Sequence, residues 1–485
     1  MSLYKSLFKQ TAIYGIATVV PRMFSFILTP LYTTPGVMDL AKYAEVSINF
    51  AWLVFFNVVL AYGMETAFFR FYNTEDKKQV ISTSTISLFW SSIAFLCTAL
   101  IFRGTLAHLL KIDAEYISYI IWVLVLDALA IAPFSKLRAD GRPVRYAFIK
   151  IGSVAFNLAL NFFFLIYLPK LAVAYPVSIF NSIYVPGFQV GYVFVANVMA
   201  SLFALVLLLP HYLRLSWHFN AALWKKMMRY SLPVMLAGIA FAINETFDRP
   251  LLKYLNVPER EIGIYSACYK LALFMTLFTT AFRLGIEPFF FSQASKENAK
   301  QIYAAITKYF VIFGSVILLG VIAFADLLKI FIIRDPAYWD GMKVVPLIIL
   351  ANFCLGIYTN LSVWYKLSDK TKMGAYISAI GAAITLLFNF VLIPIWGYTG
   401  SAIATVCAYG AMMVLSYLIG AKYYPIPYDL KTMGTYMGLA MGLSALSFYV
   451  PVLRHTYVFG ILSLIVFIVF IYKREKHILL KFINK

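Results

Sequence analysis

Charged residues and cysteines are scarce in this 485-residue chain. Only 13% of its residues are charged, whereas an ordinary soluble domain carries roughly 25%. Hydrophobic residues make up 62%. This balance excludes a soluble enzyme, a disordered chain and a coiled coil. The four cysteines lie in apolar runs without metal-ligand or disulfide spacing, so we interpret them as small hydrophobic residues: Cys97, Cys268, Cys354 and Cys407.

The sequence also lacks the short signatures of common catalytic and nucleotide-binding sites. It contains no GKS/T phosphate loop, no HExxH pair and no nucleophile elbow. The five histidines do not cluster. We therefore expect no enzymatic activity, no metal site and no catalytic cofactor. Any transport would have to use an ion gradient (Na+ or H+), a partner or the gradient of the substrate itself.

Long apolar runs dominate what is present. A helix that crosses the hydrocarbon core of a bilayer needs about 20 apolar residues. Such runs can be placed at 12–34, 43–66, 84–104, 117–137, 146–168, 187–209, 230–250, 262–285, 303–326, 343–364, 373–394, 398–420, 432–450 and 456–473. The chain is predicted to be an all-α polytopic membrane protein with about 14 transmembrane helices.

The net charge of +20 comes from 41 basic and 21 acidic residues. In a soluble protein this excess would suggest nucleic acid. Here most Lys and Arg fall into alternate loops, on the same side as both termini. Because cytoplasmic loops are enriched in Lys and Arg, both termini are predicted to be cytoplasmic and no nucleic-acid partner is expected.

A weak internal repeat links the two halves of the chain. Thr29-Pro30 precedes Tyr43 much as Arg249-Pro250 precedes Tyr265, six spans later. Asn161 and Asn389 recur at the same offset. An even offset gives both copies one orientation, so we expect two six-helix lobes related by a parallel repeat. The expected parts are 1–215 (spans 1–6), 216–425 (spans 7–12) and 426–485 (a helix pair and a basic cytoplasmic tail).

Six ionisable residues at membrane depth are the candidate functional residues. Charge inside a bilayer is costly and commonly faces a cavity or a partner. The cations are Arg22, Arg249 and Lys270, and the carboxylates are Asp127, Glu245 and Asp248. A cationic interior attracts an anionic substrate, and Arg matches phosphate geometry. For the cluster at 245–249 a self-neutralised interfacial pair is the competing interpretation, since Glu245 and Arg249 are four residues apart.

Other charges near the membrane receive structural interpretations. Lys150 and Lys308 stand near the starts of their spans and are expected to extend to the interface. Arg283 and Glu287 are four residues apart and are expected to pair at the cytoplasmic end of span 8.

The sequence resembles a known family at several of these positions. Asp248-Arg249-Pro250, the run GIYSACYKLA at 263–272, Arg22 in the first span and the six-span repeat are similar to polysaccharide (O-antigen, Wzx-type) flippases. These belong to the multidrug/oligosaccharidyl-lipid/polysaccharide (MOP) exporter superfamily. The resemblance implies two six-helix lobes around a cationic cavity and a multi-pass protein of the bacterial cytoplasmic membrane.

The resemblance also implies a substrate and site residues. The substrate would be an undecaprenyl-pyrophosphate-linked glycan, moved from the cytoplasmic to the outer leaflet by alternating access. Arg22, Arg249, Lys270, Tyr265 and Tyr269 would line the cavity. Asp127, Glu245 and Asp248 would serve as gate or coupling residues. The last two spans could form a lipid groove, and other polysaccharide-assembly membrane proteins could be partners.

Two alternatives remain at this point. A drug or metabolite exporter of the same fold would be expected to have an acidic cavity. A membrane glycosyltransferase or polymerase would be expected to have a large external loop with catalytic side chains, and no external connection here exceeds about 20 residues.

Overall fold

The computed structural model describes residues 20, 23, 26–293, 296–368, 370–454 and 457–483. This part of the chain is almost entirely helical and contains no strand. It forms two compact units, Met1–Ser266 (unit 1) and Ala267–Lys485 (unit 2). The protein is an all-α polytopic membrane protein, as predicted. The three-part division at 215 and 425 stays a prediction.

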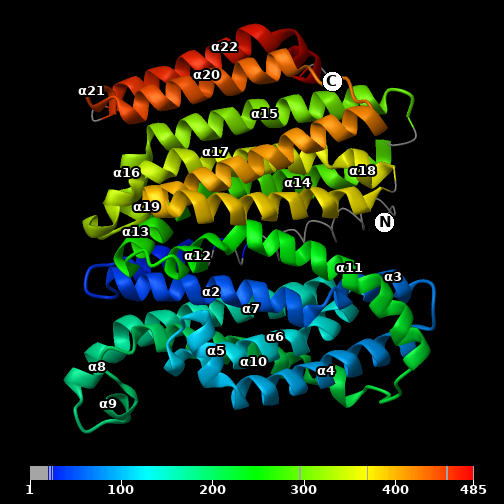
Figure 1. The fold of residues 1–485 in the computed structure, drawn as a ribbon, viewed down its shortest axis with the longest axis vertical. Coiled ribbons are helices and arrows are strands. Elements are labelled where there is room, and N and C mark those ends of the chain that lie inside the picture. The colour runs from blue at the N-terminus through cyan, green and yellow to red at the C-terminus, as the bar shows by residue number, and fades with distance from the viewer. Residues whose placement is uncertain are drawn as a thin grey trace. The chain divides into compact units, whose positions relative to one another are not determined.

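Unit 1 is built from helices that follow the predicted spans 2 to 7. They are α2 (Leu40–Ala61), α3 (Met64–Tyr72), α4 (Lys77–Ile101), α5 (Arg103–Leu110), α6 (Ala114–Ala139), α7 (Pro143–Phe162), η1 (Phe163–Tyr167), α8 (Leu168–Ala174), α9 (Ile179–Ile183), α10 (Gln189–Leu213), α11 (Ala221–Thr246), α12 (Asp248–Tyr254) and most of α13 (Glu259–Tyr269). The helix α6 packs against α4 and α10, and α10 packs against α7. The short helices α8 and α9 form a hairpin beyond the end of α7 (Figure 1).

Unit 2 holds the remaining helices. They are η2 (Lys270–Ala272), α14 (Leu273–Gln293), α15 (Ala299–Ala323), α16 (Ala325–Ile332), η3 (Pro336–Val344), α17 (Val345–Leu361), α18 (Val363–Leu367), α19 (Thr371–Tyr423), α20 (Leu430–Tyr449), α21 (Pro451–Arg454) and α22 (Val458–Ile483). The main packing partners are α17 with α19 and α15 with α20.

Helix starts follow from capping side chains placed just before the apolar runs. In each case a side-chain oxygen accepts a hydrogen bond from a backbone N–H of the first turn, which would otherwise have no intrahelical partner. The caps are Asp39 for α2, Asp76 for α4, Asp113 for α6, Asn220 for α11 and Asp429 for α20. These polar residues therefore set where the membrane helices begin.

Within the described residues, ten helices are long and apolar enough to cross a membrane. One of these, α19, is 53 residues long and contains Gly397 at φ 55° and ψ −138°. Glycine adopts this backbone conformation without steric cost. Gly397 thereby separates the predicted spans 373–394 and 398–420. The helices α20 and α22, with 20 and 26 residues, are about 30 Å and 39 Å long. The first predicted span, 12–34, falls largely outside the described residues.

Two buried asparagines make the same hydrogen bonds in the two units. Asn161 Nδ2 donates to the carbonyl oxygen of Asn157, and its Oδ1 accepts from the Tyr32 hydroxyl at 2.8 Å. Asn389 Nδ2 donates to the carbonyl oxygen of Thr385, and its Oδ1 accepts from the Ser401 hydroxyl at 2.6 Å. A satisfied amide of this kind joins neighbouring helices where water is absent. The hydroxyl donors come from non-equivalent spans, since Tyr32 is in span 1 and Ser401 in span 12, so the predicted repeat stays a prediction.

The C-terminal helices α20 and α22 pack on α15 within unit 2 (Figure 1). At one end Lys308 of α15 lies 2.7 Å from Glu475 Oε2, and Tyr436 donates to Glu475 Oε1. At the other end Arg454 donates to both oxygens of Asp326. The expectation that Lys308 extends to the interface is wrong, because a buried carboxylate is within its reach.

Candidate functional site

Unit 1 encloses a polar cavity of about 520 Å³ between its helices (the unit-1 cavity). Its walls come from α2, α6, α7 and α10, with one residue of α3. The polar residues that line it are Asn57, Glu65, Asp127, Tyr146, Lys150, Ser153, Asn157, Asn197 and Ser201. A cavity with converging polar groups inside an apolar helical protein is the default candidate for a ligand site.

Asp127 of α6 faces the unit-1 cavity, in keeping with the prediction that it has a role beyond packing. The Ser201 hydroxyl of α10 donates a hydrogen bond of 2.7 Å to Asp127 Oδ1. Hard cations bind to carboxylate, hydroxyl and amide oxygens, and a carboxylate also binds a proton. Among the described residues, no group of three His, Cys, Asp or Glu side chains is placed to hold a metal ion.

Lys150 also lines the unit-1 cavity, which sequence reasoning missed. Its ammonium lies 4.6 Å from the centroid of the Phe134 ring, in a cation–π contact. The earlier interpretation placed it at the interface because it stands near the start of span 5. In the structure the Lys150 side chain lines the unit-1 cavity, whose wall α7 shares with α6 and α10.

A helical pattern of polar residues could have identified this face. Lys150, Ser153 and Asn157 recur at intervals of three and four along α7, and Asn197 and Ser201 are four apart on α10. Residues at such intervals share one face of a helix. Polar stripes on two adjacent apolar helices therefore pointed to a common polar interior.

The mouth of the unit-1 cavity carries an exposed ion pair. Arg138 Nη1 lies 2.5 Å from Glu65 Oε1, with side-chain exposures of 39% and 50%. Glu65 of α3 thus pairs with Arg138 at the end of α6, whereas Arg70, the nearest cation on its own helix, lies 4.3 Å from the centroid of the Tyr230 ring. Because the pair is solvated, it contributes little to stability.

A second polar cluster in unit 1 contains three of the predicted residues. Asp248 Oδ2 accepts from the Tyr265 hydroxyl at 2.6 Å, and Asp248 Oδ1 lies 3.0 Å from Arg249 Nη1. The three residues are at most 8% exposed. A buried ion pair of this kind needs such additional hydrogen bonds to offset desolvation. The structure thus brings Asp248, Arg249 and Tyr265 together.

The other predicted residues lie elsewhere. Glu245 is half-buried near the end of α11. Tyr269 ends α13 and Lys270 begins the 3₁₀ turn η2, and both are half-buried. Arg22 lies outside the described residues. Among the described residues, Glu245, Tyr269 and Lys270 do not line the unit-1 cavity, and the predicted cationic cavity stays a prediction.

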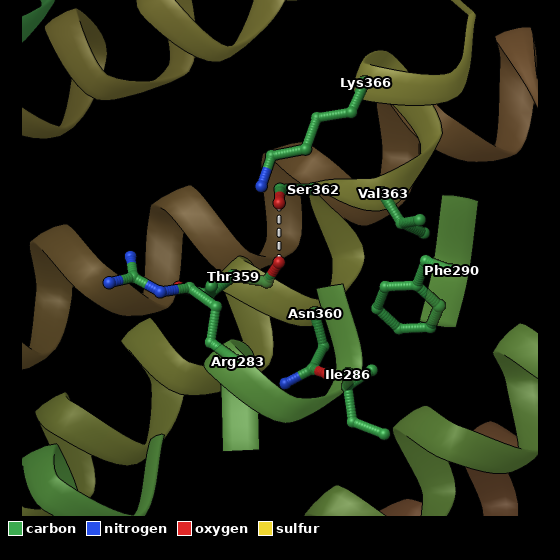
Figure 2. A pocket seen from close by; sticks show the side chains of 8 residues that line it. All are labelled: Arg283, Ile286, Phe290, Thr359, Asn360, Ser362, Val363 and Lys366. Carbon is green, nitrogen blue, oxygen red and sulfur yellow. Dashed lines mark hydrogen bonds between the residues drawn. The ribbon is translucent and has the colours of Figure 1, made fainter. Parts of the chain in front are cut away.

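Unit 2 contains a small recess of about 20 Å³ with basic walls (Figure 2). Figure 2 shows the basic side chains of Arg283 and Lys366 reaching it from different helices, α14 and α18. Ser362 donates a hydrogen bond of 2.6 Å to the Thr359 carbonyl oxygen beside it. The side chain of Glu287, the expected partner of Arg283, lies outside the described residues.

Comparisons with solved structures show the fold. The chain is similar to lipid II flippase MurJ in an inward closed conformation, with 14% identity, a TM-score of 0.74 and coverage of 96% of this chain and 99% of that one. A multidrug resistance MATE family transporter of the MOP superfamily, in its inward-facing conformation, gives 12% identity, a TM-score of 0.65 and coverage of 88% and 96%.

A MOP superfamily transporter from Pyrococcus furiosus, described as having a binding pocket of reverse polarity, gives 13% identity and a TM-score of 0.56, with coverage of 85% and 95%. No curated protein matches the chain significantly. A family model described as polysaccharide biosynthesis protein matches residues 7–274. Since this match spans more than half of the sequence, the chain belongs to the polysaccharide biosynthesis protein family and has the fold of the MOP superfamily transporters.

Proposed function

We propose that the protein is a flippase for a lipid-linked oligosaccharide, a polyprenyl-pyrophosphate-linked glycan. The polar unit-1 cavity inside a membrane protein of the polysaccharide biosynthesis family is the observation that carries this proposal. The fold shared with lipid II flippase MurJ supports it. The glycan would move from the cytoplasmic to the outer leaflet by alternating access.

The physical need for such a protein follows from the substrate. Sugar hydroxyls and a diphosphate lose their hydrogen bonds with water in about 30 Å of hydrocarbon, at a cost of several kcal/mol per group. A polar path through the protein would replace those hydrogen bonds while the polyprenyl chain stays in lipid. The amides and hydroxyls of the unit-1 cavity are groups of the required kind.

The cations at membrane depth are our candidates for the diphosphate. Arg22, Arg249 and Lys270 would contact it, with Tyr265 and Tyr269 beside them. Arg283 and Lys366 add basic groups in unit 2. Asp127, Glu245 and Asp248 are proposed as gate or coupling residues that respond to Na+ or H+. The buried Asp248–Arg249 pair would have to open for Arg249 to reach a substrate.

The same proposal predicts the membrane, the orientation and the partners of the protein. The protein would reside in the bacterial cytoplasmic (inner) membrane with both termini in the cytoplasm. It would act with other polysaccharide-assembly membrane proteins. The resemblance of the sequence to O-antigen (Wzx-type) flippases suggests O-antigen and other lipopolysaccharide glycans as the substrate class.

The test is lipid analysis of cells depleted of this protein. We expect polyprenyl-pyrophosphate-linked glycan to accumulate with its sugar still accessible from the cytoplasm. Wild-type protein should reverse the accumulation, whereas Arg22→Ala and Asp127→Asn should not. A control variant, Lys170→Ala in the external hairpin, should behave as wild type. Drug sensitivity without glycan accumulation would instead favour the MATE-like exporter, and loss of glycan synthesis itself would favour an enzyme.

A further inference from the structure

The unit-1 cavity is close to charge-balanced, which limits the ligands it favours. Lys150 supplies one positive charge and Asp127 one negative charge. The second carboxylate, Glu65, is paired with Arg138 at 2.5 Å. A diphosphate would be repelled by Asp127, and an organic cation would be repelled by Lys150. Because like charges repel strongly at low dielectric, this balance favours a polar ligand without net charge.

Three of the nine polar residues that line the unit-1 cavity are asparagines. Asn57, Asn157 and Asn197 line it from three helices, α2, α7 and α10. Each amide offers both donors and acceptors. This combination matches sugar hydroxyls, which also donate and accept.

One of these amides has a buried donor without a partner in the described part of the chain. Asn157 Oδ1 accepts from Asn161 Nδ2 at 3.1 Å, but Asn157 Nδ2 makes no hydrogen bond. An unsatisfied buried donor costs about 1–3 kcal/mol. An acceptor on a ligand in the cavity would remove that cost, so Asn157 points to an occupant.

Other residues that line the cavity are aromatic or apolar. The rings of Phe134 and Tyr146 lie 5.4 Å apart at an interplanar angle of 75°, next to Ile131 and Val154. A pyranose ring has an apolar C–H face and a polar rim. A cavity lined by both apolar side chains and amides fits such a ring, and about 520 Å³ lies within the usual range for small-ligand pockets.

We propose that the unit-1 cavity binds a single uncharged sugar ring of the transported glycan, separately from the groups that bind its diphosphate. This rests on the proposed flippase function and deepens it. The C–H face of the sugar ring packs beside Tyr146, Ile131 and Val154, since the Lys150 ammonium already lies over the Phe134 ring. The sugar hydroxyls pair with Asn57, Asn157 and Asn197. Recognition of the sugar and of the diphosphate then resides in different parts of the protein.

The experiment compares two probes on the purified full-length protein in lipid nanodiscs. One is polyprenyl diphosphate, and the other is polyprenyl diphosphate carrying one N-acetylhexosamine or hexose. We expect wild type to bind the best glycosylated probe about tenfold more tightly, which corresponds to roughly 1.4 kcal/mol from one or two added hydrogen bonds. Asn157→Leu and Asn197→Leu should abolish this difference without changing affinity for the bare diphosphate.

Two further variants and one added ion distinguish the possible results. Asn157→Asp keeps an acceptor for Asn161 but replaces the buried donor with a second carboxylate oxygen and a negative charge, so it should also reduce the sugar difference if Asn157→Leu fails to fold. Asn181→Leu, at an exposed position of α9, is the matched control and should keep it. If Asn197→Leu abolishes a stabilisation by Na+ but keeps the sugar difference, Asn197 belongs to a cation site and the sugar subsite is wrong.

The proposals for the subsite and for the function fail in different ways. If wild-type protein flips the glycosylated lipid but binds both probes equally, the sugar subsite is wrong and the flippase function holds. If the Asn variants retain the tenfold difference, the subsite is likewise wrong. If wild type in proteoliposomes flips neither probe, the flippase proposal itself is wrong.

Discussion

Single polar side chains decide much of the chemistry in this protein, because the surrounding helices are apolar. Asp127 and Lys150 line the same cavity. Only Asp127 is predicted from the sequence to have a functional role, because it lies deep in its span. Depth along a span can be read from residue number. The hydrophobic pattern does not give the face of the helix, because the apolar residues surround it. Only the spacing of polar residues such as Lys150, Ser153 and Asn157 indicates that face.

At the residue scale, Tyr265→Phe tests the Asp248 cluster. The variant removes one hydrogen bond of 2.6 Å to a buried carboxylate. Hydrogen bonds to charged groups contribute about 1.5–3 kcal/mol, so the apparent melting temperature of the detergent-solubilised protein should fall by several degrees. Tyr175→Phe, at a position 59% exposed, should leave it unchanged. Equal melting temperatures for Tyr265→Phe and wild type would contradict the assigned contact.

At the same scale, Asp326 gives a prediction for pH dependence. Burial alone would raise the pKa of Asp326, but hydrogen bonds and charge from Arg454 and Lys329 outweigh it and lower the pKa to about 2. A depressed carboxyl pKa adds stability above the unfolded value near 3.9. That stability should be lost as pH falls from about 4 to 2. Melting curves of wild type should lose more stability over this range than those of Asp326→Asn.

Breaks between helices are decided at the element scale. Span 2 was predicted as one helix, 43–66, but it divides at Gly63 into α2 and α3. Gly63 has φ +71°, and an added Cβ would lie 2.4 Å from the carbonyl oxygen of Ser231 on α11. Both the backbone angle and the close approach require glycine.

Gly63→Ala should therefore be strongly destabilising. The new methyl group has to displace the backbone of α11, and the αL conformation adds roughly 1–2 kcal/mol of strain. We expect a large drop in folded yield and melting temperature. Gly104→Ala is the matched control, since an added Cβ there meets nothing within 4 Å. Indistinguishable stability of the two variants would refute this account of the break.

The contact of α15 with the C-terminal helices also belongs to the element scale. Removing one partner of a buried ion pair costs about 3–5 kcal/mol, and Lys308 and Glu475 are 15% and 5% exposed. Lys308→Glu and Glu475→Lys should each lower the melting temperature, and the double exchange should recover much of the loss. The same exchange at Lys226 and Glu75, which are exposed, should change little. Additive losses in the double variant would exclude a direct pair.

At the scale of the whole molecule, charge distribution sets how the chain crosses the membrane. The excess of Lys and Arg in alternate loops predicts cytoplasmic termini. A cytoplasm-dependent fluorescent reporter fused after Lys485, or inserted in the 214–220 connection, should fluoresce. A reporter in the 175–186 connection should be dark, and one that fluoresced there would reverse the predicted orientation.

The membrane class and the approximate helical spans follow from the sequence, because bilayer thickness and the cost of unpaired backbone groups leave one solution for long apolar runs. The sequence also marks Asp127, Asp248, Arg249 and Tyr265 as polar residues at depth. Which of these residues meet depends on the packing of the helices. Helix rotation is set by packing between helices distant in sequence, and this packing placed Lys150 and three asparagines around Asp127 while it closed Arg249 onto Asp248.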